Sequence, residues 1–461
     1  MKFRLLLTVI FGILFICVTQ TKAQWVKINS TPYPFITSLA VTPNGAGGTN
    51  LFIGLWRSGV YKSTDNGTSW TEADAGMSYT GYVVHTFAVS PEGKDSTNLF
   101  AGTEHSVYLS TDNGTSWDDF DTVSSHALLD VVSLAIIPNG TGGINLLAGT
   151  DDGNGAFLST DRGTSWSAVN NGLTNNSGTY SVFALAVTPT GPNGVGGTNL
   201  FAGTDNDGGV FRSTNNGTSW TEVDSGLTNT YNGIFGTPTV NVFTISSGTG
   251  DTNIFAGTHG FGVFRSTNYG TSWSQVNTGL ADSEITAFAV SPNEAGGTNI
   301  FAGTWGGVFL STNNGTNWTA VNTGFTEDTV TALAIVPNGA SGSNLFAGTL
   351  DGGVWRRPLS EMITGVKEEQ NNLPSNFALE QNYPNPFNPT TTINYSVSKT
   401  SMVTIKVYDI LGNEVASLMN EERPAGRYSA NFTASKLASG VYFYRMQAGS
   451  FTETKKLILM K

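Results

Sequence analysis

Short runs of alternating apolar and polar residues fill the first three quarters of the chain. Residues 285–322 are a clear example, with runs at 285–290, 299–304, 308–311 and 318–322. Alternation with a period of two predicts β-strands, and the Gly, Pro and Asn residues between the runs predict turns. No helical period is found in this window. The pattern predicts a unit of four short antiparallel strands.

This unit recurs along the chain. The octapeptide at residues 63–70 (Ser-Thr-Asp-Asn-Gly-Thr-Ser-Trp) returns five more times, with its tryptophan at Trp117, Trp166, Trp220, Trp273 and Trp318. First runs begin seven times, near Ile36, His85, Val131, Val182, Val240, Ile285 and Val330. Four strands in a repeat of about 40 to 50 residues are typical of a propeller blade. We therefore predict an all-β fold with a seven-bladed β-propeller over residues 24–357.

Seven first runs are accompanied by only six octapeptides. The seventh unit ends at residues 354–357 without a fourth run, whereas residues 25–29, which begin with Trp25, form a fourth run without a unit. The simplest solution is that the N-terminal strand completes the last blade. Such a closure also removes an exposed sheet edge.

Small residues recur at one position of the first runs, where we expect the inner strands of a ring to leave little room. These residues are Ala40, Ala88, Ala135, Ala186, Ala289 and Ala334, with Thr244 in the fifth unit.

The two ends of the chain differ from the repeat. Residues 1–23 carry Lys2 and Arg4, an apolar run at 5–18 and a Thr-Lys-Ala ending, which predicts a cleaved secretory signal peptide. A lipoprotein signal would need a small residue before Cys17, where Ile16 stands. Residues 358–373 are expected to be a linker, and alternating runs over 374–461 predict an immunoglobulin-like β-sandwich.

Composition narrows the possible chemistry. Cys17 is the only cysteine, so the mature chain is expected to lack disulfides, thiolate catalysis and cysteine-based metal sites. The net charge is −12, and residues 24–361 hold 26 acidic against 9 basic side chains, while residues 362–461 hold 8 against 10. An acidic ring repels phosphate backbones and anionic lipid, so we expect neither nucleic-acid binding nor direct membrane insertion.

The octapeptide pattern Ser-x-Asp-x-Gly-x-x-Trp resembles the Asp-box, also known as the BNR repeat. This repeat is found in sialidases, xyloglucan-degrading hydrolases, sortilin-type receptors and photosystem II assembly factors. We expect a structural role, because Asp65, Asp112 and Asp161 become asparagine in the later copies at Asn215, Asn268 and Asn313. A cap of turn N–H groups tolerates this exchange, whereas a catalytic carboxylate does not.

The tail is similar to the type A C-terminal sorting domain of the type IX secretion system. The resemblance rests on residues 383–389 (Tyr-Pro-Asn-Pro-Phe-Asn-Pro), 407–415, 437–442 and 455–461. It implies export to the outer-membrane surface or the medium, with the type IX machinery as a partner. The residues expected to carry the sorting signal are Gly440, Val441, Tyr442, Lys455 and Lys456.

Candidate ligand contacts lie where the repeats disagree, in the loops between second and third runs. Such loops crowd one face of a propeller, where ligands usually bind. The candidates are Trp56, Arg57, Glu104, His105, Asp151, Asp152, Asp205, Asp207, His259, Trp305 and Asp351. Aromatic and carboxylate side chains suit sugar binding, although solvated hairpin tips have the same composition.

The sequence favours a monomeric binding module for a glycan or protein, without a metal or cofactor. Known alternatives within the Asp-box proteins fit less well: a sialidase needs three converging arginines, and Arg212, Arg265 and Arg356 stand in separate blades. The competing interpretation is a glycoside hydrolase, with Asp151 or Asp152 and Asp205 or Asp207 as its paired carboxylates.

Overall fold

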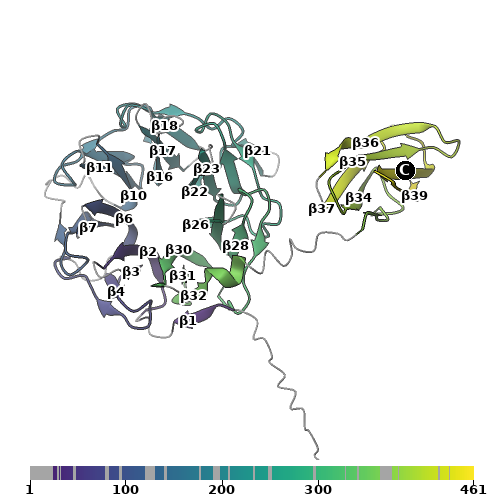
Figure 1. The fold of residues 1–461 in the computed structure, drawn as a ribbon. Helices are drawn as coiled ribbons and strands as arrows, with labels where there is room; N and C mark the ends of the chain where they lie inside the picture. The colour runs from purple at the N-terminus through teal and green to yellow at the C-terminus, as the bar shows by residue number, and fades with distance from the viewer. Residues whose placement is uncertain are drawn as a thin grey trace, which may run out of the picture. The chain divides into compact units, whose positions relative to one another are not determined.

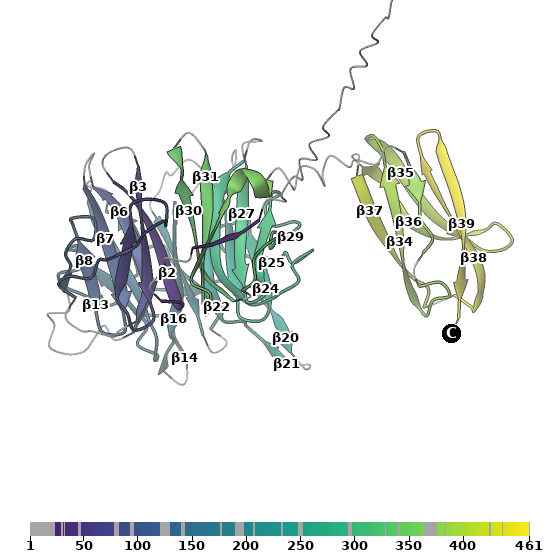
Figure 2. The same cartoon turned by 90° about the horizontal axis from the view of Figure 1, so that it is seen from below.

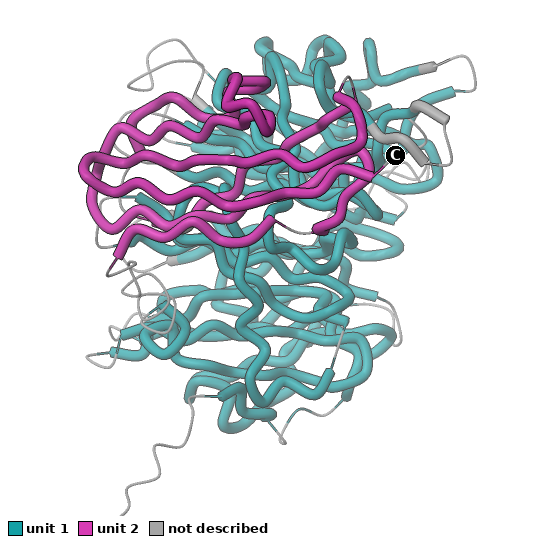
Figure 3. Tube along the Cα trace, turned by 90° about the vertical axis from the view of Figure 1, so that its right-hand side faces the viewer, with its two compact units in different colours: residues 1–363 teal, residues 364–461 magenta. Residues whose placement is uncertain are grey.

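The computed structural model describes residues 24–460 except 29–30, 32, 45–47, 78–82, 93–95, 120–129, 140–142, 176–177, 190–197, 206–207, 232–233, 248–251, 294–296, 328, 340–341, 364–375, 383, 424–425 and 436. The predicted signal peptide and most of the predicted linker thus lie outside the described residues. The chain divides into two compact units, residues 1–363 and 364–461 (Figure 3).

The first unit is a ring of seven four-stranded antiparallel sheets in its described residues, which confirms the predicted propeller (Figure 1). Blades 1 to 3 consist of β2 (Ile36–Pro43), β3 (Thr49–Leu55), β4 (Val60–Ser63) and β5 (Thr71–Glu72); β6 (Val84–Glu92), β7 (Ser96–Thr103), β8 (Val107–Ser110) and β9 (Asp118–Asp119); and β10 (Val131–Pro138), β11 (Ile144–Thr150), β12 (Ala156–Ser159) and β13 (Ser167–Ala168).

Blades 4 to 7 continue the series around the ring. They consist of β16 (Val182–Pro189), β17 (Thr198–Thr204), β18 (Val210–Ser213) and β19 (Thr221–Glu222); β22 (Val240–Ser247), β23 (Thr252–Thr258), β24 (Gly262–Ser266) and β25 (Ser274–Gln275); β26 (Ile285–Pro292), β27 (Thr298–Thr304), β28 (Gly307–Ser311) and β29 (Thr319–Ala320); and β30 (Val330–Pro337), β31 (Ser343–Thr349) and β32 (Val354–Pro358) with β1 (Val26–Ile28).

The N-terminal strand closes the ring as predicted. β1 pairs antiparallel with β32, with Val26 opposite Arg356 and Ile28 opposite Val354. Trp25 is buried, and its indole Nε1 donates a hydrogen bond to the Val321 carbonyl at 2.7 Å. The octapeptide tryptophan of blade 6, Trp318, makes the same kind of bond to Val276 of the preceding blade. Trp25 therefore occupies the place of the missing seventh octapeptide tryptophan.

A glycine in each second strand allows neighbouring blades to approach. A Cβ atom on Gly257 of β23 would lie 2.5 Å from the Ile285 side chain of the next blade. The same holds across the closure, where a Cβ on Gly348 would lie 2.5 Å from Ile36. The regular Ala-Gly-Thr ending of the second strands therefore follows from close packing between blades.

The recurring alanines of the first strands are buried between blades. Ala40 belongs to a cluster with Phe52 of its own blade and Val84 of the next, and Phe87 packs against this cluster. This burial agrees with the expectation of little room, and the contacts come from the same blade and from the next one.

The octapeptide forms a hydrogen-bonded turn between the third and fourth strands of its blade. Ser63 Oγ accepts a bond from the Gly67 N–H at 2.8 Å, and Asp65 Oδ1 accepts one from the Ser69 N–H at 2.9 Å. All six copies repeat these two bonds, including those with asparagine. Both Asn66 and Gly67 have positive φ angles, 58° and 81°.

Basic side chains of the third strands reinforce these turns. Each donates to a backbone carbonyl in the octapeptide of the following blade: Lys62 to Asn113, Arg212 to Tyr269, Arg265 to Asn314 and Arg356 to Asn66. These cations hold neighbouring blades together at the octapeptide end of the ring.

The ring extends beyond its predicted end. Pro358 belongs to β32, and residues 359–363 form a short helix. Leu359 and Met362 of this helix are buried. The assignment of 358–363 to the linker is therefore corrected, because two apolar side chains spaced three residues apart pack into the first unit.

Two further hairpins lie in the connections between blades, toward one end of the ring (Figure 2). They are β14 (Thr174–Asn175) with β15 (Gly178–Thr179), and β20 (Asn229–Tyr231) with β21 (Ile234–Gly236).

The second unit is a β-sandwich. One sheet has the order β33-β34-β37 and the other β36-β35-β38-β39. The strands are β33 (Ala378–Leu379), β34 (Thr390–Val397), β35 (Ser401–Tyr408), β36 (Glu414–Arg423), β37 (Gly426–Thr433), β38 (Gly440–Ala448) and β39 (Phe451–Leu459). Its core includes Ile393, Tyr395, Val403 and Tyr444. No helix in the described part of the chain is long and apolar enough to cross a membrane.

Candidate functional site

The loops between second and third strands gather at one end of the ring together with the connections between blades. Backbone hydrogen bonds tie the two sets together, as from the Asp151 N–H to the Asp130 carbonyl at 3.0 Å and from the Trp56 N–H to the Phe35 carbonyl at 3.2 Å. We call this end the hairpin face. It lies opposite the octapeptide turns, because each third strand runs from one to the other.

One position of the hairpin face is equivalent in all seven blades. It directly follows the last residue of the second strand, which pairs with the first residue of the innermost strand. Around the ring this position holds Trp56, Glu104, Asp151, Asp205, His259, Trp305 and Leu350. Blades 2 to 4 thus form an acidic arc, and blades 5, 6, 7 and 1 form an aromatic arc that also includes Leu350.

The aromatic arc is open to solvent. Trp56 is 47% exposed, Trp305 54% and Leu350 45%. The rings of His259 and Trp305 meet edge to face, with centroids 6.4 Å apart. The guanidinium of Arg57 lies over the Trp56 ring at 5.7 Å.

A buried carboxylate supports the aromatic arc from below. Glu284 Oε1 lies 2.8 Å from His259 Nδ1 and accepts a hydrogen bond from Asn241 Nδ2 at 3.2 Å. Burial raises the pKa of Glu284, and the charge and hydrogen bonds of His259 and Asn241 offset this only in part. A carboxylate acceptor is thereby fixed beside two exposed rings.

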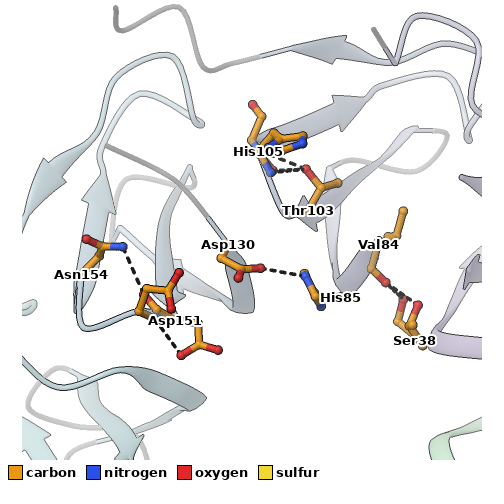
Figure 4. Close-up of polar contacts among 11 residues, drawn as sticks. Ser38, Val84, His85, Thr103, His105, Asp130, Asp151 and Asn154 are labelled. Atoms are coloured by element: carbon orange, nitrogen blue, oxygen red, sulfur yellow. Dashed lines mark hydrogen bonds and ion pairs between the residues drawn. The ribbon is translucent and has the colours of Figure 1, made fainter. Parts of the chain in front are cut away.

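The acidic arc contains a second histidine and carboxylate pair. His85 Nε2 and Asp130 Oδ1 are 2.9 Å apart and point toward each other, with Asp151 of the neighbouring hairpin close by (Figure 4). Burial raises the pKa of Asp130, His85 opposes this, and Asp151, Glu104 and Asp152 raise it further. These carboxylates therefore lie near enough to repel one another.

The predicted candidates fall into three groups. Trp56, His259 and Trp305 lie in the aromatic arc, and Glu104, Asp151 and Asp205 lie in the acidic arc. Arg57, His105, Asp152 and Asp351 occupy the next residue of their hairpins, and Arg57 and Asp152 have positive φ angles of 59° and 57°. Asp207 lies outside the described residues.

Some candidates have structural partners. Asp205 Oδ1 accepts a hydrogen bond from the Ser181 N–H at 3.0 Å, and Asp151 Oδ1 accepts one from the Asp152 N–H at 2.7 Å. Asp151 and Asp205, two of the carboxylates proposed for hydrolysis, thus take part in holding the hairpins.

Sequence reasoning missed several residues of this face. Asp130 and Glu284 each precede an innermost strand, and Leu350 stands beside the selected Asp351. Tyr33 and Phe35 are also exposed, in the segment that joins β1 to blade 1. Most of the second strands end in threonine. An alignment of the repeats on this threonine would have placed Leu350, rather than Asp351, at the equivalent position.

The described residues contain no group of three or more His, Cys, Asp or Glu side chains that could hold a metal ion.

The predicted sorting residues lie in the second unit. Gly440, Val441 and Tyr442 begin β38, and the Tyr442 hydroxyl donates to the Ala438 carbonyl at 2.8 Å. Lys455 and Lys456 lie in β39, where Lys455 Nζ is 3.0 Å from Glu453 Oε1. Lys456 pairs with Phe443 across the two strands.

Two family models match parts of the chain. Residues 381–460 match the secretion system C-terminal sorting domain, and residues 58–183 match the model described as sortilin, neurotensin receptor 3. None of the curated proteins compared with this sequence matches it.

The solved structures that match this chain share little sequence with it. PorZ, an essential bacterial surface component of the type-IX secretion system of Porphyromonas gingivalis, is 14% identical; the match covers 92% of this chain and 51% of PorZ, with a TM-score of 0.37. The chain thus spans about half the length of PorZ. U3-55K is 13% identical over 73% of this chain and 98% of its own, with a TM-score of 0.50. The Dos1 propeller is 17% identical over 71% and 79%, with a TM-score of 0.44.

The matched sorting domain indicates where the protein is located. The chain is exported through the type IX secretion system to the cell surface, as predicted from the tail. Its first unit is a secreted or surface propeller.

Proposed function

We propose that the ring is a non-catalytic carbohydrate-binding module displayed outside the cell, and that the aromatic arc contacts the glycan. Flat indole faces stack on the apolar faces of sugar rings, and fixed carboxylates accept hydrogen bonds from sugar hydroxyls. Trp305 and Trp56 would provide the faces, and Glu284 beside His259 an acceptor.

The observation that carries this proposal is the exchange of residue types at one equivalent position. Blades 2 to 4 build the same hairpin position with Glu104, Asp151 and Asp205, so the fold does not require an aromatic residue there. Trp56 and Trp305 nevertheless expose large apolar surfaces. Exposed apolar groups that the fold does not need mark an interaction site.

The charge of the hairpin face favours a neutral glycan over an acidic one. The hairpin face carries few cations. Of the Lys and Arg residues that the structure describes in the ring, Arg57 is the one on this face. Lys62, Arg212, Arg265 and Arg356 are engaged at the octapeptide end. Carboxylates such as Asp130 and Glu284 would repel a sialic or uronic acid.

The test is a glycan array with the full chain, followed by titration of the neutral oligosaccharide that binds best. Trp305→Ala and Trp56→Ala are each expected to weaken binding about 10-fold or more, because stacking is lost. Val26→Ala is the control, since Val26 is exposed on the outer strand β1. Binding that survives both tryptophan substitutions would contradict the assignment.

A hydrolase remains the competing proposal, and the raised pKa of Asp130 among Glu104, Asp151 and Asp152 favours it. A carboxyl group whose pKa is raised by neighbouring carboxyl groups is typical of the acid in an acid and base pair. Release of reducing ends from the bound oligosaccharide, abolished by Asp130→Asn, would support hydrolysis. Binding without release supports the module.

A further inference from the structure

A five-residue turn in the second unit presents two apolar side chains to solvent. The turn, residues 409–413, joins β35 to β36. Ile410 is 73% exposed and Leu411 82%, more than any other large hydrophobic side chain in the described residues. Aliphatic groups of this size lose solvation free energy when left in water, so their exposure at a tip calls for a reason.

Hydrogen bonds hold the turn in one conformation. Asp409 Oδ1 accepts bonds from the Leu411 N–H at 2.9 Å and the Asn413 N–H at 2.8 Å, and Asn413 Nδ2 donates to Asp409 Oδ2 at 2.9 Å. The Asp409 N–H donates to the Asn413 carbonyl at 3.0 Å, and Gly412 takes a φ of 82°. These bonds lower the pKa of Asp409, so its carboxylate stays charged and keeps the turn closed.

The fold of the unit does not require apolar residues at such a tip. The hairpin between β38 and β39, at the opposite end of the same sheet, turns through Gly449 and Ser450, which are small and exposed. Ile410 and Leu411 are therefore presented by a fixed turn without serving the core. Fixing them beforehand reduces the entropy that a partner must remove on binding.

We propose that Ile410 and Leu411 are the anchor residues by which a protein receptor of the secretion machinery holds this domain, in an apolar pocket of that receptor. The turn lies inside the matched sorting domain at residues 381–460, whose export requires recognition by that machinery. This inference does not depend on the ligand of the ring.

Charge favours a protein pocket over a lipid bilayer. The carboxylates of Asp409 and Glu414 flank the two apolar residues. Lys406 is engaged with Glu414 at 2.8 Å, and the guanidinium of Arg445 lies over the Tyr408 ring at 5.2 Å. Surfaces that bind anionic membranes carry unpaired Lys and Arg beside their apolar residues. The turn at residues 409–413 has carboxylates beside its apolar residues instead.

The test compares export of full-chain variants in a bacterium with an active type IX system. The fraction of protein outside the cell is expected to fall about 10-fold or more for Ile410→Ser combined with Leu411→Ser, since two anchor side chains are removed. Met402→Ser is the matched control, because Met402 is half exposed on the adjacent strand β35. Export of the double variant at the normal level, or an equal loss in the control, would overturn the proposal.

Two further measurements separate docking from folding and from lipid binding. The thermal midpoint of the purified double variant is expected to match the unsubstituted protein, because the side chains are exposed; a reduced midpoint together with reduced export would overturn the docking role. Full-chain protein is expected not to float with vesicles of phosphatidylethanolamine and phosphatidylglycerol. Flotation that depends on Ile410 and Leu411 would overturn the protein pocket in favour of a membrane.

Discussion

The two ends of each blade obey different constraints. At the octapeptide end, six copies keep nearly the same residues, because most of them bond within the turn or to the preceding blade. At the hairpin face, one backbone position accepts tryptophan, histidine, leucine and carboxylates. The comparison teaches that the most conspicuous repeat in this sequence is scaffold, and that the residues free to differ are the ones available for recognition.

The pKa values of carboxyl groups are also shifted in opposite directions at the two ends. Burial would raise the pKa of Asp65 in the first octapeptide, but hydrogen bonds from Ser69 and Ser63 outweigh it and lower the pKa. At the hairpin face, burial dominates and the pKa values of Asp130 and Glu284 are raised. The octapeptide thus stabilises its negative charge, whereas the hairpin face tolerates charge at a cost.

The largest expected contrast is between two tryptophans of blade 6. Trp318 is buried and bonded to Val276 of the preceding blade, so Trp318→Ala is expected to reduce the free energy of unfolding by about 3–5 kcal/mol. Trp305→Ala is expected to change it by less than about 0.5 kcal/mol, because the side chain is exposed. Denaturant unfolding measures both, and equal losses would break the distinction between the two ends.

A smaller contrast concerns glycines. A Cβ on Gly257 would lie 2.5 Å from the Ile285 side chain, so Gly257→Ala is expected to cost about 1–3 kcal/mol through overpacking. A Cβ on Gly306 of the hairpin face would lie 3.0 Å from Asp282 Oδ2 and 3.3 Å from Asp282 Cβ, so the contact is with one side chain and is less close. Thermal unfolding of Gly306→Ala should therefore stay near the unsubstituted protein, and a shift as large as that of Gly257→Ala would argue against close blade packing as the reason for the repeated glycine.

A fall in pH is expected to lower the stability of the propeller through its octapeptide aspartates. Because the folded-state pKa values of Asp65, Asp112 and Asp161 are lowered, their contribution to stability is present above the unfolded pKa and is lost as the pH falls through the folded value. Exchange of all three for asparagine, as blades 4 to 6 already have, should flatten the loss of thermal midpoint between about pH 5 and pH 2.5. An unchanged dependence of the thermal midpoint on pH would show that the charge of these aspartates adds nothing to the hydrogen bonds that cap the turn.

The smallest expected effect is the pH dependence contributed by Glu284, which is opposite in sign to that of the octapeptide aspartates. The raised pKa of Glu284 means that its contribution is present below the unfolded pKa and is lost as the pH rises through the folded value. Relative to the unsubstituted protein, Glu284→Gln should therefore gain thermal stability as the pH rises from about 4 to 7. A relative loss over this range would show that the bond to His259 outweighs burial.

Periodicity made the ring predictable, because each blade repeats the same alternation and the count of runs required Trp25 to close it. The end of the ring was missed because a single helical turn with Leu359 and Met362 carries too little periodicity to be recognised. The hairpin face was recovered in part: Trp56, His259 and Trp305 interrupt a repeated pattern. Glu284 and Asp130 join His259 and His85 only through space, across connections between blades, and no local pattern records such a contact.

Closure by β1 sets the order in which the ring can be completed. Val26 pairs with Arg356, so the contact spans nearly the whole length of the propeller. Pairing of such distant segments carries a high loop-closure entropy and forms slowly. In a chain that crosses a membrane with its N-terminus first, Trp25 therefore stays unpaired until blade 7 has followed. The first tryptophan of the propeller can therefore be buried only after the last blade is available to pair with β1.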